Sequence, residues 1–309
     1  MKQRLVLLGG AGFIGQSFTR WLGQEGLRAK SEIAILDPKE PKFCEPDHYL
    51  RLKIEDTDEV RDFVKDKDII FHLVHTTIPA ESQNAPGREE RENLTPSKNL
   101  FTALAKKRGV KIVYFSSGGT IYGEPAEQKP VPESASPAPG SLYAQTKLAI
   151  ENLVREAGAS SELKYLIIRP ANPYGPFQEI LNRHGAVGRI FKDLNEGLWF
   201  SVYGDGKTIR DYIYIDDFLA GLFLVLKNDY WGQTFNIGTG TGASLKQLID
   251  LCEKVSGKKL KTKYEPIRGT DLKYNVLDRS KISSLGWEPE HTLRRGLRKT
   301  WEYFRKKYQ

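Results

Sequence analysis

The first half of the chain alternates short apolar runs with longer stretches in which apolar residues recur every three or four positions. The short runs predict strands and the periodic stretches predict helices. The strands are expected at 4–8, 32–36, 69–73, 111–115 and 164–168, and the helices at 13–23, 57–64, 97–107 and 142–156. This alternation predicts an α/β fold, a doubly wound parallel sheet of the Rossmann kind with helices on both faces.

Beyond Arg169-Pro170 the alternation weakens and turn-rich segments appear. We therefore expect one domain over 1–170, to which a segment near 210–240 returns, and a smaller α+β domain over 171–309. Thr95-Pro96 allows two interpretations of the helix before it. Either Thr95 caps a helix that starts at Pro96, or the helix starts near Arg88 and Pro96 kinks it.

The formal charge of +8 changes this picture little, because much of the excess lies in 294–307. The spacing there predicts an amphipathic helix with a solvated basic face, although a phosphate-bearing small substrate held by separate arginines is an alternative. The chain has no stripe of alternating aromatic and basic residues and no zinc knuckle, so we expect no nucleic-acid partner.

Two isolated cysteines, Cys44 and Cys252, are too few for a disulfide framework or a zinc site, and we expect no metal. No apolar run approaches the roughly 20 residues that a membrane span requires. The apolar run Leu5–Leu8 flows into glycines and predicts a strand, not a secretion signal. We therefore expect a cytoplasmic protein with no membrane partner.

A glycine-rich segment, Gly9-Gly-Ala-Gly12-Phe-Ile-Gly15, follows the first predicted strand directly and opens the first predicted helix. Glycines at 9, 12 and 15 allow a tight turn, a close approach to a pyrophosphate and close packing of helix on strand. The helix N-terminus adds amide donors and a positive dipole end. The segment therefore predicts a dinucleotide site.

Asp37 ends the second predicted strand, about 20 residues further on, as such sites require. Its carboxylate would bind a ribose 2′-hydroxyl and repel a 2′-phosphate, which favours NAD over NADP. Lys39 and Lys42 weaken that preference without reversing it. Asp37 could instead serve only as a turn former before Pro38.

A Tyr followed four residues later by a Lys occurs four times, and the context selects Tyr143/Lys147. The other pairs fall in an alternating strand, a turn and a basic C-terminal helix: Tyr49/Lys53, Tyr203/Lys207 and Tyr303/Lys307. Only Tyr143 and Lys147 share a predicted helix that follows a hydroxyl-bearing strand end, Ser116–Gly123.

This pair suits proton and hydride chemistry on a sugar or alcohol. A Tyr with a pKa near 10 is a poor base at neutral pH. A Lys ammonium one helical turn away, with the positive charge of an oxidised nicotinamide, would bring the Tyr143 pKa toward the working pH. Tyr143 could then take a hydroxyl proton, Lys147 could also hold the cofactor ribose, and a strand-end hydroxyl would orient the substrate oxygen.

These segments together resemble the extended short-chain dehydrogenase/reductases, and within them the NAD-dependent nucleotide-sugar epimerases. The similarity covers nearly the whole chain and includes, besides the motifs above, His72-Leu-Val, Asn93, Arg169–Pro176, Tyr203–Gly206, Arg210–Asp217, Asn236–Gly238, Arg268–Asp271 and Leu285–Pro289. The resemblance implies an enzyme that binds a nucleotide sugar, most simply a UDP-sugar, and a homodimer formed through the helices near 97–107 and 142–156.

The resemblance also assigns further residues. Those expected to bind NAD, besides the glycines, Asp37, Tyr143 and Lys147, are Phe13, Ile14, Ile54, Leu73, Val74, Thr77, Asn93 and Ser116. Those expected to bind the nucleotide sugar are Ser117, Asn172, Gly185, Val202, Tyr203, Arg210, Arg268, Asp271 and Asn275. Among them Asn172, Arg210 and Arg268 would hold the diphosphate, since arginines form bidentate bonds to phosphate oxygens.

The chain departs from the family pattern at Gly118, Gly119 and Lys53. Gly118 stands where a catalytic Ser or Thr is usual, so the orienting hydroxyl must come from Thr120, Ser117 or water, and Thr120 is our candidate. Gly119 leaves this stretch without the carboxylate that related dehydratases use, which disfavours 4,6-dehydration. Lys53 replaces an adenine-binding Asp, and Asn275 leaves open whether an N-acetyl group fits.

Three functional hypotheses follow. The first is a 4-epimerase of a UDP-sugar, glucose/galactose or their N-acetyl forms, which passes through a transient 4-keto sugar. The second is a 4-ketoreductase of a deoxysugar nucleotide, which uses the same site but releases its cofactor. The third is a non-catalytic NAD-binding protein, for which Gly118 is the best support and Tyr143/Lys147 the counter-evidence.

Overall fold

The structure, a computed structural model, describes residues 2–84, 86–178, 185–267, 269 and 271–307. Its main sheet has seven strands in the order β10-β6-β5-β4-β1-β2-β3, and the neighbouring pairs from β6 to β3 are parallel. The strands are β1 (Gln3–Leu8), β2 (Ser31–Leu36), β3 (His48–Leu50), β4 (Ile69–His72), β5 (Lys111–Phe115), β6 (Lys164–Pro170) and β10 (Gln233–Ile237). The prediction of a Rossmann sheet is confirmed.

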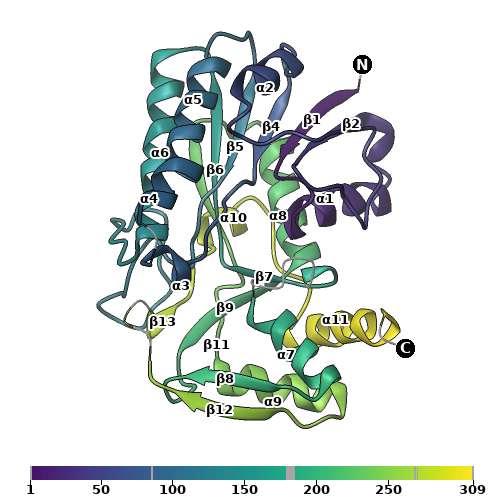
Figure 1. Cartoon of the computed structure of the whole chain (residues 1–309), viewed down its shortest axis with the longest axis vertical. Helices are drawn as coiled ribbons and strands as arrows, with labels where there is room; N and C mark the ends of the chain where they lie inside the picture. Colours follow the sequence, from purple (N-terminus) through teal and green to yellow (C-terminus); the bar gives the residue numbers. More distant parts are fainter. Residues whose placement is uncertain (1, 85, 179–184, 268, 270, 308–309) are drawn as a thin grey trace. The chain divides into compact units, whose positions relative to one another are not determined.

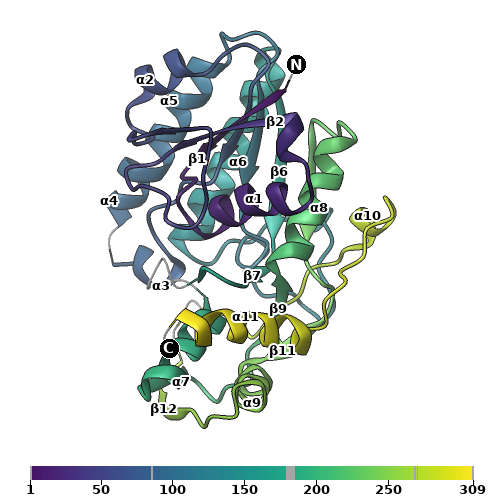
Figure 2. The ribbon, with the colours of Figure 1, turned by 90° about the vertical axis from the view of Figure 1, so that its right-hand side faces the viewer.

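Helices cover both faces of this sheet (Figure 1, Figure 2). On one face α2 (Thr57–Phe63), α5 (Thr95–Leu104) and α6 (Leu142–Ser160) bury a continuous apolar core, in which Leu100 and Ile150 pack with Ile112 of β5. On the other face lies α1 (Phe13–Gln24), whose Phe18 ring is centred 5.1 Å from that of Phe71 on β4. The apolar runs of the strands are therefore buried from both sides.

The helix around Pro96 begins earlier than Thr95. It runs through α4 (Pro86–Glu89), a π-helical segment at Glu90–Leu94 and α5, and Leu94 has helical backbone angles. Thr95 therefore does not cap a new helix, and the second interpretation is the better one. Pro96 has no N–H to donate to the carbonyl four residues earlier, so the helix lacks one backbone hydrogen bond there. The π-helical segment lies directly before Thr95-Pro96. The short α3 (Pro79–Ser82) and the 3₁₀ turn at Arg28–Lys30 complete this part of the chain.

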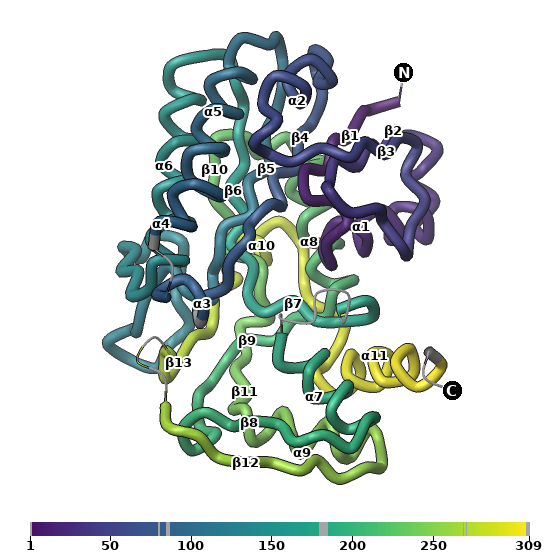
Figure 3. Tube along the Cα trace, in the orientation of Figure 1, coloured from purple at the N-terminus to yellow at the C-terminus, as the bar shows by residue number. Residues whose placement is uncertain are grey.

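The chain forms two compact units. The first comprises Met1–Ser117, Pro139–Arg169 and Leu226–Phe235, and the second comprises Gly118–Ala138, Pro170–Val225 and Asn236–Gln309. The segment that returns to the first unit supplies part of β10, which lies beside β6 (Figure 3). The expected boundary near residue 170 and the segment expected to return near 210–240 compare with Pro170 and Leu226–Phe235 in the structure, where Gly118–Ala138 also leaves the sheet after β5 and bonds within the second unit.

The second unit contains two small sheets and several helices. One sheet holds β7 (Asn172–Tyr174), β9 (Ile209–Tyr214), β11 (Gly242–Ser244) and β13 (Tyr274–Asn275), and the other pairs β8 (Trp199–Tyr203) with β12 (Lys261–Glu265). The helices are α7 (Ala186–Glu196), α8 (Ile215–Lys227), α9 (Leu245–Ser256), α10 (Ser280–Ser283) and α11 (Leu293–Lys307).

The basic C-terminal helix is amphipathic, as predicted. Trp301 and Phe304 of α11 pack on Phe191 of α7, with ring centres 5.4 and 5.9 Å apart, while Arg298 and Arg305 are exposed. The excess of positive charge thus lies largely on a solvated face. Within the described part of the chain, no helix has the length and apolar character needed to cross a membrane.

Candidate active site

The glycine-rich turn joins β1 to α1 with the geometry that its sequence predicts. Gly9 has a φ of +76°, which favours glycine, and a Cβ on Gly15 would lie 2.5 Å from the carbonyl oxygen of Gly10. Gly12 is the N-cap of α1 and provides no side-chain cap, so the first amides of the helix have no side-chain acceptor there. Phe13 and Ile14 form the first turn. The turn therefore presents a helix N-terminus suited to a pyrophosphate.

Asp37 follows β2 directly and is hydrogen-bonded to this turn. Its carboxylate accepts hydrogen bonds from the backbone N–H of Ala11 at 3.1 Å and of Lys39 at 2.8 Å. Burial raises the pKa of Asp37, and these two bonds oppose that effect. Asp37 thus holds the glycine-rich turn in place at the position where a ribose-binding carboxylate is expected.

Tyr143 and Lys147 lie in the first two turns of α6. Ser141 caps this helix by accepting from the Ala144 N–H at 3.2 Å, which fixes where the helix starts and which face Tyr143 presents. The Lys147 ammonium donates to the carbonyl of Phe115 at 2.8 Å and lies 5.9 Å from the centre of the Tyr143 ring. Ser117, at the end of β5, forms a side-chain hydrogen bond with Tyr143. Strand end and helix thus meet as the sequence suggested.

The environment sets the charges of this pair. Burial raises the pKa of Tyr143 to about 12, against the opposing effect of the Ser117 hydrogen bond. Burial lowers the pKa of Lys147 to about 7, and the carboxylates of Glu89 and Glu151 oppose that shift. A Tyr in this state is protonated at neutral pH and needs added positive charge before it can act as a base.

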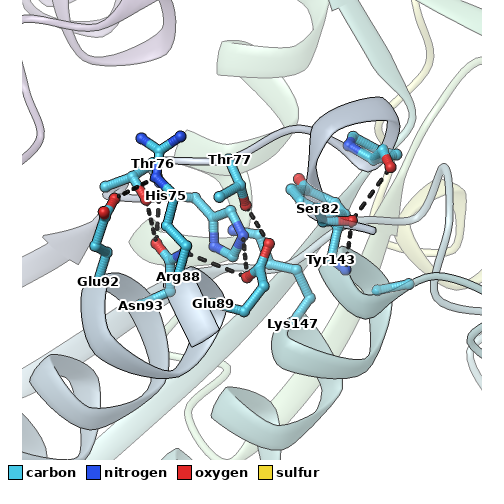
Figure 4. Close-up of polar contacts among 12 residues, drawn as sticks. His75, Thr76, Thr77, Ser82, Arg88, Glu89, Glu92, Asn93, Tyr143 and Lys147 are labelled. Atoms are coloured by element: carbon cyan, nitrogen blue, oxygen red, sulfur yellow. Dashed lines mark hydrogen bonds and ion pairs between the residues drawn. The ribbon is translucent and has the colours of Figure 1, made fainter. Parts of the chain in front are cut away.

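Two residues that sequence reasoning missed lie in the same cluster (Figure 4). Glu89 is 4% exposed, and its carboxylate accepts from the Thr77 hydroxyl and from the Asn93 amide at 3.2 Å. His75 lies 3.4 Å from that carboxylate and places its ring edge-on to Tyr143, with ring centres 4.6 Å apart. No pattern in the sequence indicated that these two residues, fourteen positions apart in a segment without a known motif, would pair.

The other residues expected around NAD all belong to the first unit. Val74 packs against Gly9, where a Cβ would approach it to 3.0 Å, and Leu73 follows β4 and bonds to Leu8 of β1. Asn93 accepts from the Thr76 N–H at 2.9 Å. Ile54, Thr77, Asn93 and Ser116 are buried, whereas Leu73 and Val74 are half-buried. Thr77 and Asn93 both donate hydrogen bonds to Glu89, and Asn93 also binds the backbone of the loop at Thr76.

In the second unit, Gly118 is explained by packing. A Cβ on Gly118 would lie 2.5 Å from Leu277 Cδ1 and 2.9 Å from the carbonyl oxygen of Pro170. The carbonyl of Gly118 accepts from the side chain of Asn275 at 3.0 Å, and Asn275 is fully buried. No described residue bonds to the Oδ1 of Asn275. Thr120 belongs to this unit and is half-buried.

Several residues expected to bind the nucleotide sugar share one sheet of the second unit. Asn172 on β7 donates to the carbonyl of Asp211 at 2.9 Å, and Arg210 on β9 is in register with Asn275 on β13. Burial lowers the pKa of Arg210, while Asp271 opposes the shift. Arg210 and Asn275 are thus neighbours across the two strands, and Asn172 pairs with β9 two residues further along, at Tyr212.

The remaining predicted residues are more scattered. Val202 and Tyr203 end β8 in the other small sheet, and Gly185 is the N-cap of α7 with a φ of +89°. Arg268 lies outside the described residues. Among the residues that the structure describes, no three His, Cys, Asp or Glu side chains are grouped to hold a metal ion.

Sequence comparisons with known proteins agree with this fold. Residues 5–238 match the sequence profile of the NAD dependent epimerase/dehydratase family. A UDP-glucose 4-epimerase of Mycolicibacterium smegmatis is 31% identical, over 99% of this chain and 100% of that protein. A dTDP-4-dehydro-6-deoxyglucose reductase of Escherichia coli is 26% identical, over 96% of each chain.

Two solved structures have a similar fold. The UDP-glucose 4-epimerase of Thermotoga maritima with UDP-glucose has a TM-score of 0.90 and 31% identity, over 99% of this chain and 100% of that one. The UDP-glucose 4-epimerase of Thermus thermophilus in complex with NAD has a TM-score of 0.88 and 30% identity, over 98% of this chain and 99% of that one. The likeness extends over both units of the chain.

Proposed function

Since the chain belongs to the NAD dependent epimerase/dehydratase family and is an NAD-dependent nucleotide-sugar epimerase, we propose that it inverts C4 of UDP-sugars. UDP-glucose and UDP-galactose are the first candidate substrates, followed by their N-acetyl forms. The observation that carries the proposal is the cluster of Tyr143, Lys147 and Ser117, in which a buried phenol meets one hydroxyl and one ammonium.

The residues of the first unit fit NAD. The turn at Gly9–Gly15 has no side chain where a pyrophosphate would approach, and Asp37 stands at the end of β2. Lys147 would hold the nicotinamide ribose as well as act on Tyr143. When bound, NAD supplies the acceptor and the donor of the C4 hydride.

In the proposed reaction, Tyr143 takes the proton of the C4 hydroxyl, and the sugar passes through a 4-keto intermediate. Tyr143 later returns the proton to the C4 oxygen, and the product has the opposite configuration at C4. The pKa of about 12 shows why Tyr143 needs help. The Lys147 ammonium stabilises the phenolate, and the Ser117 hydroxyl orients both the phenol and the substrate oxygen. Asn172, Arg210 and Arg268 would bind the diphosphate, while Val202 and Tyr203 would meet the base and Asp271 would support Arg210.

The test is to incubate the purified protein with UDP-glucose, UDP-galactose and both N-acetyl forms, and to separate the products by chromatography. We expect interconversion of at least one pair without added cofactor, and loss of about 10²–10⁴-fold in kcat in Tyr143→Phe. Full activity in Tyr143→Phe, or no interconversion of any of the four sugars, would refute the proposal.

The similarity to a dTDP-4-dehydro-6-deoxyglucose reductase supports a second candidate, the reduction of a 4-keto deoxysugar nucleotide. The same Tyr143 would then donate a proton to the C4 oxygen. Turnover that depends on added NADPH would favour the reductase, and tightly bound NAD in the purified protein would favour the epimerase. The non-catalytic alternative loses its best support, because packing accounts for Gly118.

We also propose a homodimer formed through the outer faces of α5 and α6. A groove of about 380 Å³ lies there between the two helices, and its lining combines apolar residues such as Phe101 and Leu153 with polar and charged ones such as Lys98 and Glu156. Light scattering after size-exclusion chromatography tests this proposal. A cytoplasmic location is also proposed, and the two free cysteines, Cys44 and Cys252, support it.

A further inference from the structure

The second unit has a basic groove that the proposed reaction does not use. Helices α9 and α11 pack against each other in this unit (Figure 2). Beside them lie two pockets of about 560 and 480 Å³, which share Val255 and Arg298 as lining residues and therefore adjoin as one groove. Six basic side chains line this groove: Lys254, Lys258, Arg294, Arg295, Arg298 and Arg305.

The positive charge of the groove lacks counter-ions among the described residues. Glu302 is the one carboxylate of the described lining, and none of the six basic side chains forms an ion pair with a described carboxylate. Lysines that follow soon after in the sequence are paired, Lys259 with Glu253 at 2.6 Å and Lys263 with Glu265 at 3.0 Å. A concave surface lined by one sign of charge concentrates the electric field, so the groove attracts an anion from outside the chain.

We propose that this groove between α9 and α11 binds an extended acidic segment of a partner protein. Aspartate and glutamate side chains of the segment would pair with the arginines, because guanidinium groups bind carboxylates through two parallel hydrogen bonds. The proposal does not depend on the reaction proposed at Tyr143, since the binding of the segment requires no turnover.

The spacing of the arginines indicates an extended ligand. Arg294, Arg298 and Arg305 recur at intervals of four and seven residues, which places them on one side of α11. At a rise of 1.5 Å per residue they span roughly 16 Å along the helix. A single phosphate or carboxylate group cannot reach all three, whereas an extended peptide of about five residues covers the same length.

The neutral lining residues suit a peptide backbone. Asn195, Ser256 and Thr292 line the groove, and their side chains can form hydrogen bonds with peptide groups. Lys258 donates to the Oδ1 of Asn195 at 3.2 Å, and its ammonium lies 5.5 Å from the centre of the Trp301 ring. One cation of the groove is therefore oriented before a ligand binds, which lowers the entropy cost of binding.

Two other polyanions fit the groove less well. Single-stranded nucleic acid stacks its bases on exposed aromatic rings, but Trp301 is only 6% exposed. A helix that lies on a membrane surface inserts apolar side chains. In the part of α11 that the structure describes, every exposed residue is charged: Arg294, Arg295, Arg298, Glu302, Arg305 and Lys306.

Fluorescence anisotropy of a labelled octaglutamate peptide, titrated with the full-length protein, tests the proposal. At about 50 mM salt we expect a Kd below about 100 μM, and at about 300 mM salt a several-fold weaker one because exposed charges are screened. Octaglutamine, which is uncharged, should not bind. In Lys258→Glu/Arg298→Glu the Kd for octaglutamate should rise by about 10-fold or more, because two attractive contacts become repulsive.

The matched control is Lys129→Glu/Lys207→Glu. It changes the net charge by the same amount at two exposed lysines of the second unit, which pair with Glu127 at 2.6 Å and Asp205 at 3.1 Å. Its Kd should stay within about twofold of wild type, because these lysines lie outside the groove. Equal weakening in the two double variants would overturn the proposal, since binding would then follow net charge alone.

The wild-type protein also decides between the partners. A Kd above about 100 μM for octaglutamate at low salt would overturn the proposal. So would tighter binding of octathymidine, or binding to vesicles that contain phosphatidylserine at lower protein concentrations than to the peptide. Should the groove variant fail to fold, ¹⁵N-labelled wild-type protein titrated with octaglutamate should show its largest amide shifts within 254–258 and 292–305. Largest shifts elsewhere would contradict the proposal.

Discussion

Restoring the hydroxyl that Gly118 lacks should harm the protein. In Gly118→Ser, the new Cβ would lie 2.5 Å from Cδ1 of Leu277 and 2.9 Å from the carbonyl oxygen of Pro170. Real Cβ atoms do not approach other heavy atoms so closely, so something must move. Leu277 is fully buried and the Pro170 oxygen also accepts the Gly118 N–H at 2.9 Å, so neither neighbour moves without cost.

Overpacking of this kind costs about 1–3 kcal/mol of unfolding free energy. With an unfolding entropy of about 2.1 cal/mol/K per residue over the chain, this corresponds to a fall in Tm of about 2 to 5 °C. Activity should not rise in Gly118→Ser, because Ser117 already bonds to Tyr143. The variant would thus lose stability and gain no catalytic hydroxyl.

Thermal and urea denaturation followed by circular dichroism would measure the loss. Gly140→Ser is the matched control, since a Cβ at Gly140 meets nothing within 4 Å, and its stability should stay within about 0.5 kcal/mol of wild type. Truncating the neighbour in Gly118→Ser/Leu277→Ala should make the double change less costly than the sum by about 1 kcal/mol. Equal stability of Gly118→Ser and Gly140→Ser, or additive costs in the double variant, would refute the steric explanation.

Other predictions concern the charges and hydroxyls of the site. Ser117→Ala should lower kcat by about 10- to 100-fold, as for a lost hydrogen bond to a charged group, whereas Thr120→Val should change kcat less; the reverse order would favour Thr120 as the orienting residue. Burial lowers the pKa of His72 to about 3, so wild-type stability should fall as the pH drops from about 6.5 toward 3. In His72→Phe, urea unfolding should show that slope reduced by up to about 1.4 kcal/mol per pH unit; an unchanged slope would contradict it. Glu151→Gln should cost about 3–5 kcal/mol because it removes the negative charge that pairs with the buried Arg169, and a loss below about 1 kcal/mol on the same assay would show that the ion pair is dispensable. Arg210→Ala should raise KM for a UDP-sugar more than it lowers kcat; an unchanged KM would remove Arg210 from the diphosphate site.

The Rossmann sheet could be predicted from the residues alone. Strands buried on both faces must be apolar throughout, so β1, β2, β4, β5 and β6 are visible as short apolar runs. The turn at Gly9–Gly15 could equally be predicted, because the positive φ of Gly9 favours glycine and no Cβ fits at Gly15. Tyr143 and Lys147 were readable because a helix brings residues four apart onto one face.

Contacts between distant elements determine which residues act on that pair, and these contacts became visible only in three dimensions. The three-residue strand β3 and the small sheets of the second unit have weak patterns, since short strands at a surface need few apolar positions. Sequence spacing could not choose between Ser117 and Thr120, because the choice depends on which hydroxyl the chain turns toward Tyr143 after β5. Nor could it find His75 and Glu89, whose pairing depends on how the loop after β4 and α4 fold back on α6. Local periodicity encodes which face of an element is buried, whereas the partners of a buried charge depend on contacts between elements far apart in the chain.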